Sequence, residues 1–420
     1  MDYNEATKYL YSLTNLENSR RFELMRDGYE NVKKVLGILG IDYKGNIIHI
    51  AGTKGKGSVA YFSSYLLSKF CGYKVGLFTS PHLLKVNERI SVLENGVESN
   101  ISDEDFTRLV EIIREVKEKY SLNLTTFDFL TVMAMYYFRV FQKVDYIVLE
   151  VGLGGRLDST NFCIPDVSII TLIDYDHTSV LGETLTKIAY EKAGIIKPKV
   201  PVISSSQRET VRKVFRKVAK QNDTKVFFID EIYNILDVDI SINGTESLVE
   251  DVKSKEKFQV SFNLIGQHFV DNLLLAYEGV RMLCDIPKNV LQNLKFDIKG
   301  RFEVIKKKPL IVFDVAHTPM SVDVVLRNFV SLKSCDKFDL IVSLMKDKEI
   351  TKIAKVVSKY FNYIDRIFLL ELDSNDGSKK LYDEIRTLGF RNVYKFKDFS
   401  ISKDTLVFGS FRIYEVFSKI

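Results

Sequence analysis

The chain has 420 residues, too many for one hydrophobic core, and its length predicts two domains that each bury a core of their own. Hydrophobic residues make up 46% and charged residues 27%, as in soluble globular proteins, and no apolar run is long enough to span a bilayer. The 60 basic and 55 acidic residues leave a net charge of +5, without the concentrated basic patch that a nucleic-acid binder needs. We therefore expect small anionic ligands, with no nucleic-acid partner and no membrane partner.

The N-terminus and the cysteines indicate a cytoplasmic protein. The first residues, MDYNEATKYL, carry acidic side chains and no apolar core of the kind found in a secretory signal. Cys71, Cys163, Cys284 and Cys335 lie far apart and form no CxxC pair, which argues against a zinc site and against a disulfide framework. We expect reduced thiols, most of them buried.

Residues 46–78 have the pattern of a strand, a helix and a second strand. NIIHIAG is a β-branched run, and KVGLF is another. Between them, apolar residues recur at helical spacing, namely Val59, Phe62, Leu66, Leu67 and Phe70. Similar alternation follows in VDYIVLEVG, DVSIITLID, ETLTKIAYEKAGII, VPVISS and ETVRKVFRKVAKQ. Together these segments predict a mostly parallel sheet covered on both faces, with ligands beyond the carboxyl ends of its strands.

The rhythm changes twice in the second half of the chain. Residues 233–265 alternate polar and apolar positions around INGTES, which predicts antiparallel hairpins, and a helix from His268 to Cys284 follows. The α/β alternation then restarts in PLIVFDVA, FDLIVSLM, RIFLLEL, NVYKFK and TLVFGS. We place a domain boundary near Lys299. The predicted fold is α/β, with a mostly parallel sheet plus a small antiparallel sheet in residues 1–298 and a Rossmann-like α/β domain in residues 299–420.

The stretch IAGTKGKGS, residues 50–58, is typical of a phosphate-binding loop although it departs from the Walker A spacing. It follows a strand, and its glycines allow backbone N–H groups to face an anion at the start of a helix. Lys56 adjoins the helix start and is the better phosphate ligand of the two lysines. The alternative is a glycine-rich turn with solvated lysines. The candidate nucleotide-binding residues are Gly52, Thr53, Lys54, Gly55, Lys56, Gly57 and Ser58.

Polar side chains follow three other predicted strands. Ser80 comes after KVGLF, Glu150 ends a very apolar strand, and Asp176 and His177 follow DVSIITLID. Hydroxyl, carboxylate and imidazole groups are plausible ligands of Mg²⁺ beside a nucleotide. His49 lies inside a strand and is expected in the core. A lone loop histidine such as His177 is more often structural than a metal ligand, so the position alone leaves both roles open.

Seven motifs together resemble those of the folylpolyglutamate synthase and dihydrofolate synthase family, within the Mur ligase superfamily. They occur in family order and read GTKGKGS, FTSPHLLKVNERI, LEVGLGGRLDSTN, DHTSVLGETLTKIAYEKAGIIKP, GRFEV, DVAHTP and FGS. The resemblance covers residues 50–410, and EVGLGGRLDSTN and EKAGIIKP are specific to the folate branch. It implies ATP-dependent amide formation, in which a pteroate or folate carboxylate takes the γ-phosphoryl group and the amine of L-glutamate displaces phosphate.

The same resemblance assigns roles in the first domain. It places Lys56 and Ser58 in the triphosphate cradle, and Ser80, Glu150 and His177 on Mg²⁺. Lys192 matches a lysine that is carbamylated in the family and completes a second Mg²⁺ site, since an unmodified lysine is a poor metal ligand. The alternative for Lys192 is a solvated or salt-bridged helix lysine.

For the second domain the resemblance implies contacts to nucleotide and glutamate. Arg301 and Asp314 match nucleotide contacts, and Asn272 of GQHFVDN lies near the adenine. His317 belongs to the phosphate and glutamate end, with Ser410 near the glutamate. Without the family match, a linker arginine and helix-capping residues would be the better interpretation. Because the contacts are divided between domains, we expect domain closure to complete the site.

LTTFDF and LDST resemble segments that line the dihydropteroate pocket, which suggests that the enzyme adds the first glutamate as well as later ones. The candidates are Thr125, Phe127, Asp158 and Ser159. An aromatic ring beside an acid suits a flat heterocycle with N–H donors, although Phe127 could equally belong to the core.

Three positions depart from the family motifs. Lys54 replaces the Asn of GTNGKGS, Thr318 replaces the Asn of AHNP, and Phe269 replaces the Gln of GxHQ. None of them removes an assigned metal ligand. Lys54 adds a charge near the phosphates, and the other two affect the expected glutamate and adenine contacts.

The sequence leaves three other interpretations open. A cell-wall amino-acid ligase of the Mur type usually has an extra N-terminal domain, whereas few residues precede the loop here. A P-loop kinase or regulatory ATPase, or a nucleotide-binding module without catalysis, would need no glutamate. Family members resemble monomers, so we expect a monomer.

Overall fold

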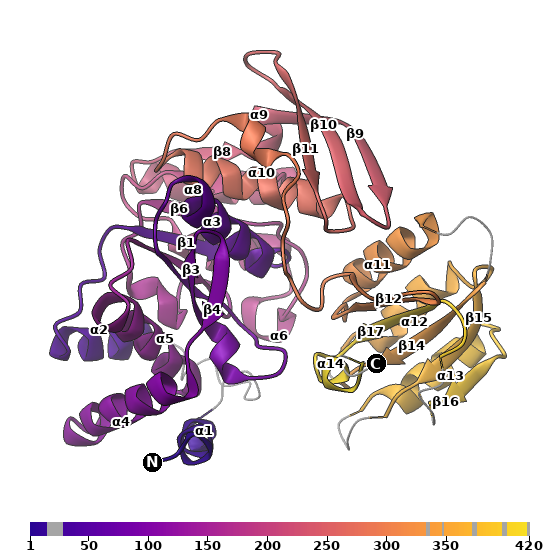
Figure 1. Ribbon diagram of the computed structural model, residues 1–420, viewed down its shortest axis with the longest axis horizontal. Coiled ribbons are helices and arrows are strands. Elements are labelled where there is room, and N and C mark those ends of the chain that lie inside the picture. Colours follow the sequence, from indigo (N-terminus) through magenta and orange to yellow (C-terminus); the bar gives the residue numbers. More distant parts are fainter. Residues whose placement is uncertain (15–27, 333–336, 347, 372–375, 397–400, 418–420) are drawn as a thin grey trace. The chain divides into compact units, whose positions relative to one another are not determined.

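The computed structural model describes residues 1–14, 28–332, 337–346, 348–371, 376–396 and 401–417. The chain forms two compact units (Figure 1). Unit 1 comprises Met1–Ile235, Val249–Phe258 and Val270–Val290, and unit 2 comprises Leu236–Leu248, Gln259–Phe269 and Leu291–Ile420. The division at Lys299 into an ATP-binding and a glutamate-ligase domain concerns function and stays a prediction.

Unit 1 is built on an eight-stranded sheet in the order β4-β3-β2-β5-β1-β6-β7-β8. Its strands are β1 Ile47–Ala51, β2 Val75–Phe78, β3 Ile90–Glu94, β4 Val97–Asn100, β5 Tyr146–Glu150, β6 Val167–Ile170, β7 Val202–Ser204 and β8 Val226–Phe228. The neighbouring pairs β2-β5, β5-β1, β1-β6, β6-β7 and β7-β8 are parallel. Strand β3 pairs antiparallel with both β2 and β4. The predicted mostly parallel sheet is confirmed.

Helices cover this sheet. They are α1 Tyr3–Ser12, α2 Gly28–Ile38, α3 Lys56–Phe70, α4 Asp103–Lys119, α5 Thr126–Tyr136, α6 Thr178–Leu181, α7 Leu185–Lys192, α8 Glu209–Gln221, α9 Ile229–Ile232 and α10 His268–Arg281. Short 3₁₀ or π turns are η2 Val86–Arg89, η3 Tyr137–Phe141, η4 Ser159–Phe162, η5 Ala193–Ile195 and η6 Lys288–Leu291.

The helices form where apolar periodicity and capping agree. Ser102 caps α4 by accepting a hydrogen bond from the Asp105 amide at 3.0 Å, and acidic residues fill the first turn of that helix. The sheet residues Phe78 and Leu149 share one buried cluster with helices α4 and α5. Ile170 belongs to a second cluster, which contains residues of α7 and α8. Paired residues of parallel strands share a face, so these two clusters lie side by side on one face of the sheet. The alternate residues Ile48, Val148 and Ile169 point to the other face and are fully buried there, and a Cβ atom on Gly279 of α10 would lie 2.5 Å from Ile169. The sheet is therefore buried on both faces, as the sequence predicted.

A small three-stranded sheet follows, in the order β11-β10-β9. Its strands are β9 Tyr233–Ser241, β10 Gly244–Asp251 and β11 Lys257–Phe262. Successive strands are neighbours, and the tight turn at Ile242 and Asn243 joins the first two, as expected for antiparallel hairpins.

Unit 2 contains a six-stranded sheet in the order β12-β13-β17-β14-β15-β16. Its strands are β12 Glu303–Lys307, β13 Leu310–Asp314, β14 Phe338–Ser343, β15 Ile364–Leu369, β16 Val393–Lys395 and β17 Thr405–Gly409. Only β12 is antiparallel to its neighbour. The helices are α11 Pro319–Ser331, α12 Ile350–Ser358, α13 Ser378–Thr387 and α14 Arg412–Phe417, and the first three supply side chains to the core of this unit. This is the predicted second α/β domain.

The cysteines correct one prediction. Cys71, at the end of α3, and Cys284, just after α10, form a disulfide with their Cα atoms 6.3 Å apart. The expectation that these two thiols are reduced was wrong because 213 residues of sequence separate cysteines that the fold brings together. Cys163 is a buried free thiol, as expected, and burial raises its pKa to about 12. Cys335 lies outside the described residues.

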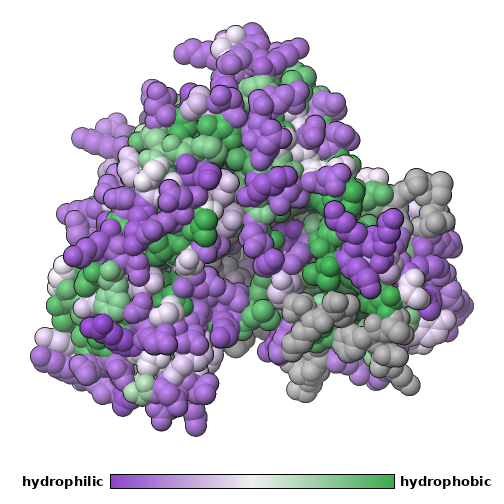
Figure 2. All heavy atoms as spheres, in the orientation of Figure 1, coloured by the Kyte–Doolittle hydropathy of each residue, from purple (hydrophilic) through white to green (hydrophobic). Residues whose placement is uncertain are grey.

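Figure 2 shows mostly hydrophilic side chains on this face, with smaller hydrophobic areas between them. Exposed large apolar side chains include Leu84 and Val97. Scattered apolar residues of this kind are normal for a protein surface. Over the described ranges, no helix is both long and apolar enough to cross a membrane.

Candidate active site

The candidate site lies where four parallel strands of unit 1 end side by side. Strands β2, β5, β1 and β6 are consecutive in the sheet, and Ile50 pairs with Glu150 while Ala51 pairs with Ile170. The loops that begin at Gly52, Thr79, Val151 and Thr171 therefore leave the same edge of the sheet. The phosphate-loop residues, Ser80 and His177 follow these strand ends, and Glu150 is the last residue of β5. Of the other residues assigned to phosphate or metal, Lys192 lies on α7 and His317 in unit 2.

The phosphate loop ends at Gly55, the residue that precedes helix α3. Gly55 has a left-handed φ of 91°, and no side chain caps the helix. A Cβ atom at this position would lie 2.6 Å from Oδ1 of Asn272, so only glycine lets α10 rest against the loop. The first turn of α3 contains no acidic residue. Its N–H groups and the positive end of the helix dipole suit an anion.

Ser80 and Glu150 come together beside this helix start. The Glu150 carboxylate is 3% exposed, and its Oε2 accepts a hydrogen bond from the Ser80 amide at 3.0 Å. A Cβ atom on Gly57 would lie 3.5 Å from the same oxygen. The carboxylate therefore sits at the positive end of α3, next to the loop that carries the Ser80 hydroxyl.

The loop after Ser80 is held by a single carboxylate. Glu88 accepts hydrogen bonds from the amides of Leu83, Leu84 and Lys85 at 2.6 to 2.9 Å. His82, in the same loop, accepts a hydrogen bond at Nδ1 from Nε of Arg89 at 2.9 Å. The PHLLKVNER segment thus forms a compact turn next to the predicted metal ligand.

His177 follows β6 and is the N-cap residue of α6, with a left-handed φ of 47°. Its side chain is 52% exposed, and its amide donates to Oδ1 of Asp176 at 3.0 Å. Within the residues described, no three His, Cys, Asp or Glu side chains form a metal-binding group. The predicted set of Ser80, Glu150 and His177 includes only two such side chains, so it depends on the serine hydroxyl. His49, by contrast, is fully buried against Thr160, which confirms its place in the core.

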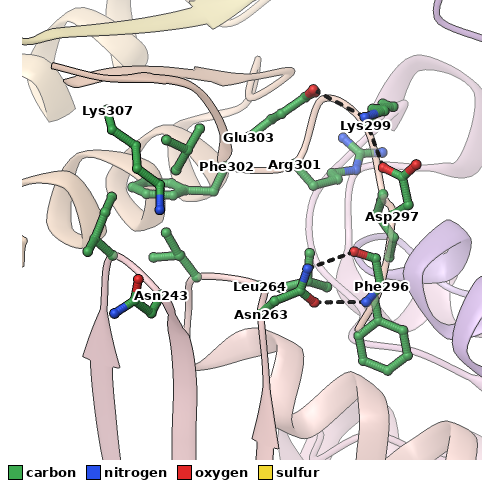
Figure 3. Close-up of a pocket in the computed structure, with 14 residues that line it drawn as sticks. Asn243, Asn263, Leu264, Phe296, Asp297, Lys299, Arg301, Phe302, Glu303 and Lys307 are labelled. Atoms are coloured by element: carbon green, nitrogen blue, oxygen red, sulfur yellow. Dashed lines mark hydrogen bonds and ion pairs between the residues drawn. The ribbon is translucent and has the colours of Figure 1, made fainter. Parts of the chain in front are cut away.

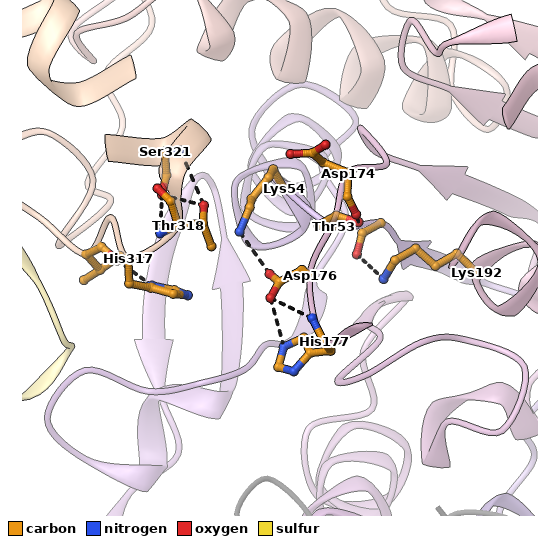
Figure 4. Close-up of polar contacts among 11 residues, drawn as sticks. Thr53, Lys54, Asp174, Asp176, His177, Lys192, His317, Thr318 and Ser321 are labelled. Atoms are coloured by element: carbon orange, nitrogen blue, oxygen red, sulfur yellow. Dashed lines mark hydrogen bonds and ion pairs between the residues drawn. The ribbon is translucent and has the colours of Figure 1, made fainter. Parts of the chain in front are cut away.

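Lys192, at the end of α7, is turned inward. Its side chain is 4% exposed, and Nζ donates a hydrogen bond to the carbonyl oxygen of Gly52 at 2.7 Å (Figure 4). Burial, together with the charge of Lys56, lowers the pKa of Lys192 to about 7. The alternative of a solvated helix lysine is therefore wrong. The amine lies against the phosphate loop and is close to neutral at physiological pH.

The predicted pterin residues are organised by a residue that the sequence reasoning missed. Asp128 is 1% exposed, and its Oδ2 accepts a hydrogen bond from the Thr125 hydroxyl at 2.7 Å, while Oδ1 accepts one from the Ser159 hydroxyl. Burial raises its pKa. Thr125 and Asp128 form the capping box of α5, and the T-x-x-D spacing in TTFDF was the available signal.

Asp158 and Phe127 support the glycine-rich loop after β5. Asp158 is 2% exposed and accepts hydrogen bonds from the Leu153 amide at 2.9 Å and from the Thr160 hydroxyl at 2.6 Å. The half-buried ring of Phe127 lies against Gly152, where an added Cβ would come within 2.6 Å of it, and its centroid is 5.6 Å from that of Phe78. Asp158 therefore positions the loop, and Phe127 is both a core contact and a wall beside it.

Four predicted residues lie in unit 2. Asp314 is the last residue of β13, His317 and Ser410 follow β13 and β17, and Arg301 precedes β12. Asp314 accepts a hydrogen bond from the Phe302 amide at 2.8 Å, and burial raises its pKa to about 6 against the opposing charge of Arg301. The ring of Phe411 lies 5.9 Å from the Arg301 guanidinium and 6.2 Å from the His317 ring. Ser410 precedes Phe411, which therefore joins Arg301, His317 and Ser410 in one cluster. Sequence reasoning missed Phe411, for which FGSF offers no local signal.

Arg301 also lines a pocket of about 300 Å³ in unit 2 (Figure 3). Asn263 braces its wall by exchanging two hydrogen bonds with the backbone of Phe296, at 2.8 and 2.9 Å. Among the residues that line the pocket, Lys299 forms an ion pair with Asp297 at 2.9 Å. This pocket is polar and basic at Arg301, Lys299 and Lys307, which favours an anionic group.

Two of the three departures from the family motifs have structural explanations. Thr318 is the N-cap residue of α11 and forms a capping box with Ser321, a role in which Thr and Asn are interchangeable. Phe269 is 1% exposed and packs against His268 and Phe262, so its side chain belongs to the core. Asn272, one turn further along α10, remains beside the phosphate loop.

Comparisons with known proteins agree with this arrangement. The family model for the Mur ligase middle domain matches residues 50–278, and that for the Mur ligase glutamate ligase domain matches residues 300–404. The chain therefore has the middle domain and the glutamate ligase domain of the Mur ligases.

Individual relatives narrow the class. The dihydrofolate synthase/folylpolyglutamate synthase of Bacillus subtilis is 32% identical over 351 residues, which cover 79% of this chain and 78% of that protein. The protein of the same name from Buchnera aphidicola subsp. Schizaphis graminum is 31% identical and covers 96% and 93%. A folylpolyglutamate synthase structure in complex with AMPPCP and folate has a TM-score of 0.81 and 25% identity over 100% of this chain and 99% of that one. The chain belongs to the folylpolyglutamate synthase and dihydrofolate synthase family.

Proposed function

We propose that this protein is a cytoplasmic, monomeric ligase that uses ATP to join L-glutamate to dihydropteroate, to folates, or to both. The observation that carries the proposal is the meeting, at one edge of the unit 1 sheet, of an anion-binding helix start, a buried carboxylate and a buried lysine. Family membership supports the same chemistry, since an ATP analogue and folate bind a relative of the same fold.

ATP would bind with its phosphates on the loop Gly52–Ser58. Lys56 and the free end of the α3 dipole offset the phosphate charge, and Ser58 is buried in the first turn of that helix. Asn272 borders the loop at Gly55 and is the candidate contact to the base. Arg301 and Asp314, which lie together in unit 2, are the proposed contacts to the rest of the nucleotide.

The donor set at the sheet edge fits Mg²⁺. The buried Glu150 carboxylate has Oε2 paired with a backbone amide and is an anionic oxygen donor, the type that Mg²⁺ prefers. Ser80 and His177 would complete the protein's contribution to the first ion. When bound there, Mg²⁺ would offset the charge of the phosphates.

Lys192 is the proposed origin of a second site. A neutral amine can add to CO₂, forming a new N–C bond and releasing one proton, and the product is a carbamate with two acceptor oxygens. The buried position of Lys192 against the phosphate loop supports this step, because an exposed lysine would be protonated and hydrated instead. The carbamate would then be an anionic ligand for the second Mg²⁺.

The remaining residues are the proposed contacts to the pterin substrate and to glutamate. The cluster organised by Asp128, with Thr125, Phe127, Asp158 and Ser159, is the proposed contact to the pterin end. The substrate carboxylate attacks the γ-phosphorus and ADP leaves; the glutamate amine then attacks the acyl carbon and phosphate leaves with the bonding pair. Nδ1 of His317 lies 2.8 Å from the Val315 carbonyl oxygen, which fixes the orientation of the ring, and His317 is the proposed contact at the phosphate and glutamate end. Ser410 is the proposed glutamate contact.

Parallel incubations test this proposal. The protein, ATP and Mg²⁺ are mixed with either dihydropteroate or tetrahydrofolate, with and without L-glutamate, and products are weighed by mass spectrometry while phosphate is measured. We expect phosphate release that requires glutamate and a product heavier by one glutamyl residue, from at least one substrate. Turnover of ATP without glutamate, with phosphate transferred to an acceptor, would instead indicate a kinase or ATPase.

A further inference from the structure

Lys54 forms an ion pair that the family motif does not include. It stands where the related motif has Asn, and its Nζ lies 3.0 Å from Oδ2 of Asp176 (Figure 4). The two side chains are only 24% and 21% exposed, so solvent screens the pair less than it would a surface pair. The first lysine of the loop, Lys54, therefore has a defined partner on the neighbouring loop.

This ion pair is the outermost of several links between the phosphate loop and the loop after β6. The amides of Thr53 and Lys54 both donate to the carbonyl oxygen of Leu172, at 3.0 and 3.2 Å. The Thr53 hydroxyl donates to the carbonyl oxygen of Asp174 at 3.2 Å. Residues 53–54 and 172–176 thus form one connected unit, which ends next to His177.

Asp176 passes this connection to His177. Its Oδ1 accepts a hydrogen bond from the His177 amide at 3.0 Å, while Oδ2 faces Lys54. His177 has a φ of 47°, a left-handed conformation that is unfavourable for a residue with a Cβ and needs support from its surroundings. A carboxylate held from one side by Lys54 can hold the His177 backbone from the other.

We propose that Lys54 is a positioning residue, which acts through Asp176 to hold His177 against the phosphate loop and does not itself bind the triphosphate. The inference rests on the proposed function insofar as His177 is a ligand of the nucleotide-bound Mg²⁺. Lys56 remains the lysine that meets phosphate, because it begins the helix whereas Lys54 is committed to Asp176. Lys54 also offsets the charge of a carboxylate that would otherwise face the incoming phosphates unopposed.

A double-mutant cycle separates this role from direct phosphate binding. The four proteins are the wild type, Lys54→Asn, Asp176→Asn and the double variant, and the affinity of each for AMPPCP in Mg²⁺ is measured by calorimetry. We expect each single substitution to weaken binding about fivefold, the upper range for a partly exposed ion pair, and the double variant to be no weaker than either single variant. The proposal would be overturned if the two single losses of AMPPCP affinity multiplied in the double variant. It would also be overturned if the Lys54→Asn variant bound AMPPCP as tightly as the wild type. Lys54→Arg should bind as the wild type does, since a guanidinium can keep the pair.

A second readout uses the ligand-free protein and does not depend on the enzymatic activity. Amide hydrogen exchange in residues 172–178 should be several-fold faster in Lys54→Asn than in the wild type, because the loop loses its side-chain link. The matched control is Lys74→Asn. Lys74 pairs with Glu94 at 2.9 Å and directly precedes β2, so it lies at the amino-terminal ends of the parallel strands, away from the candidate site. Unchanged exchange in Lys54→Asn would overturn the positioning role even if the protein proved to be a ligase. Faster exchange in a protein without glutamate-dependent turnover would support it and reject only the proposed function.

Discussion

Substitution of Lys192 by Ala probes the most unusual group in the site. The change removes three methylene groups and the amine of a buried side chain, which costs about 2–5 kcal/mol of folding free energy in well-packed interiors. It also leaves the Gly52 carbonyl without the donor at 2.7 Å, which adds about 1–3 kcal/mol unless water enters. Relief of the burial of an amine offsets part of this loss. The variant should therefore fold with reduced stability, and its phosphate loop should lose one support.

The variant should lose more activity than its reduced stability alone would explain. Loss of a preorganised electrostatic group typically lowers kcat about 10²–10³-fold, and the group lost here is the proposed anionic ligand of the second Mg²⁺. Because the deletion leaves space beside the phosphate loop, formate or acetate should enter it and raise kcat by at least about tenfold, replacing the carbamate oxygens. The assay is glutamate-dependent phosphate release, measured at increasing concentrations of each acid with ionic strength held constant.

Lys197→Ala is the matched control, because Lys197 ends the same motif and also donates to a backbone carbonyl, that of Asn161 at 3.0 Å. Burial lowers its pKa too, but it has no assigned metal role. Short acids should not restore any activity that this control loses. Full activity of Lys192→Ala, or equal rescue of both variants, would refute the assignment of Lys192 as a carbamylated ligand.

Three further predictions address other parts of the molecule. Asp128→Ala should raise KM for the pteroate substrate about tenfold or more while KM for ATP stays constant, because the Thr125 and Ser159 hydroxyls lose their shared acceptor. Steady-state kinetics, in which each substrate is varied in turn, will show which KM changes. A dithiol reductant should lower the thermal unfolding midpoint, since opening the Cys71–Cys284 link frees a loop of 213 residues worth up to about 5 kcal/mol of chain entropy; a midpoint that reductant leaves unchanged would show that the bond does not form. The pKa of Asp314 is raised by burial from 3.8 to about 6, so the folded state binds more protons than the unfolded state between these values and stability falls as pH rises through this window. Asp314→Asn should flatten that decline in chemical unfolding measured from pH 4 to 7, and an unchanged slope would contradict the assignment.

The periodic part of the fold was predictable because local pattern and tertiary environment agree. Buried parallel strands such as Ile47–Ala51 and Tyr146–Glu150 are apolar throughout, and α8 has a strongly amphipathic sequence. The antiparallel strands β3 and β4 were not predicted, since every residue of β4 is exposed and its sequence, VESN, has no alternating apolar pattern. Edge strands of this kind are determined by pairing partners rather than by their own sequence.

The site shows the same division. The positions of Ser80 and Glu150 followed from strand order, because residues that end neighbouring parallel strands meet at one edge. Asp128 and Phe411 were missed because their importance lies in contacts to residues distant in the sequence. The partner of Lys54 was equally hidden, since 122 residues separate it from Asp176.

In the proposed reaction, ATP activates a carboxylate of the pterin substrate as an acyl phosphate before glutamate attacks. Isotope transfer tests this step: the reacting carboxylate of the substrate is labelled with ¹⁸O, ATP, Mg²⁺ and L-glutamate are added, and the isotope content of the released phosphate is determined by mass spectrometry. Because one carboxylate oxygen leaves with the phosphoryl group, each amide formed should transfer one labelled oxygen to phosphate. Formation of the amide with phosphate free of label would contradict the acyl-phosphate route.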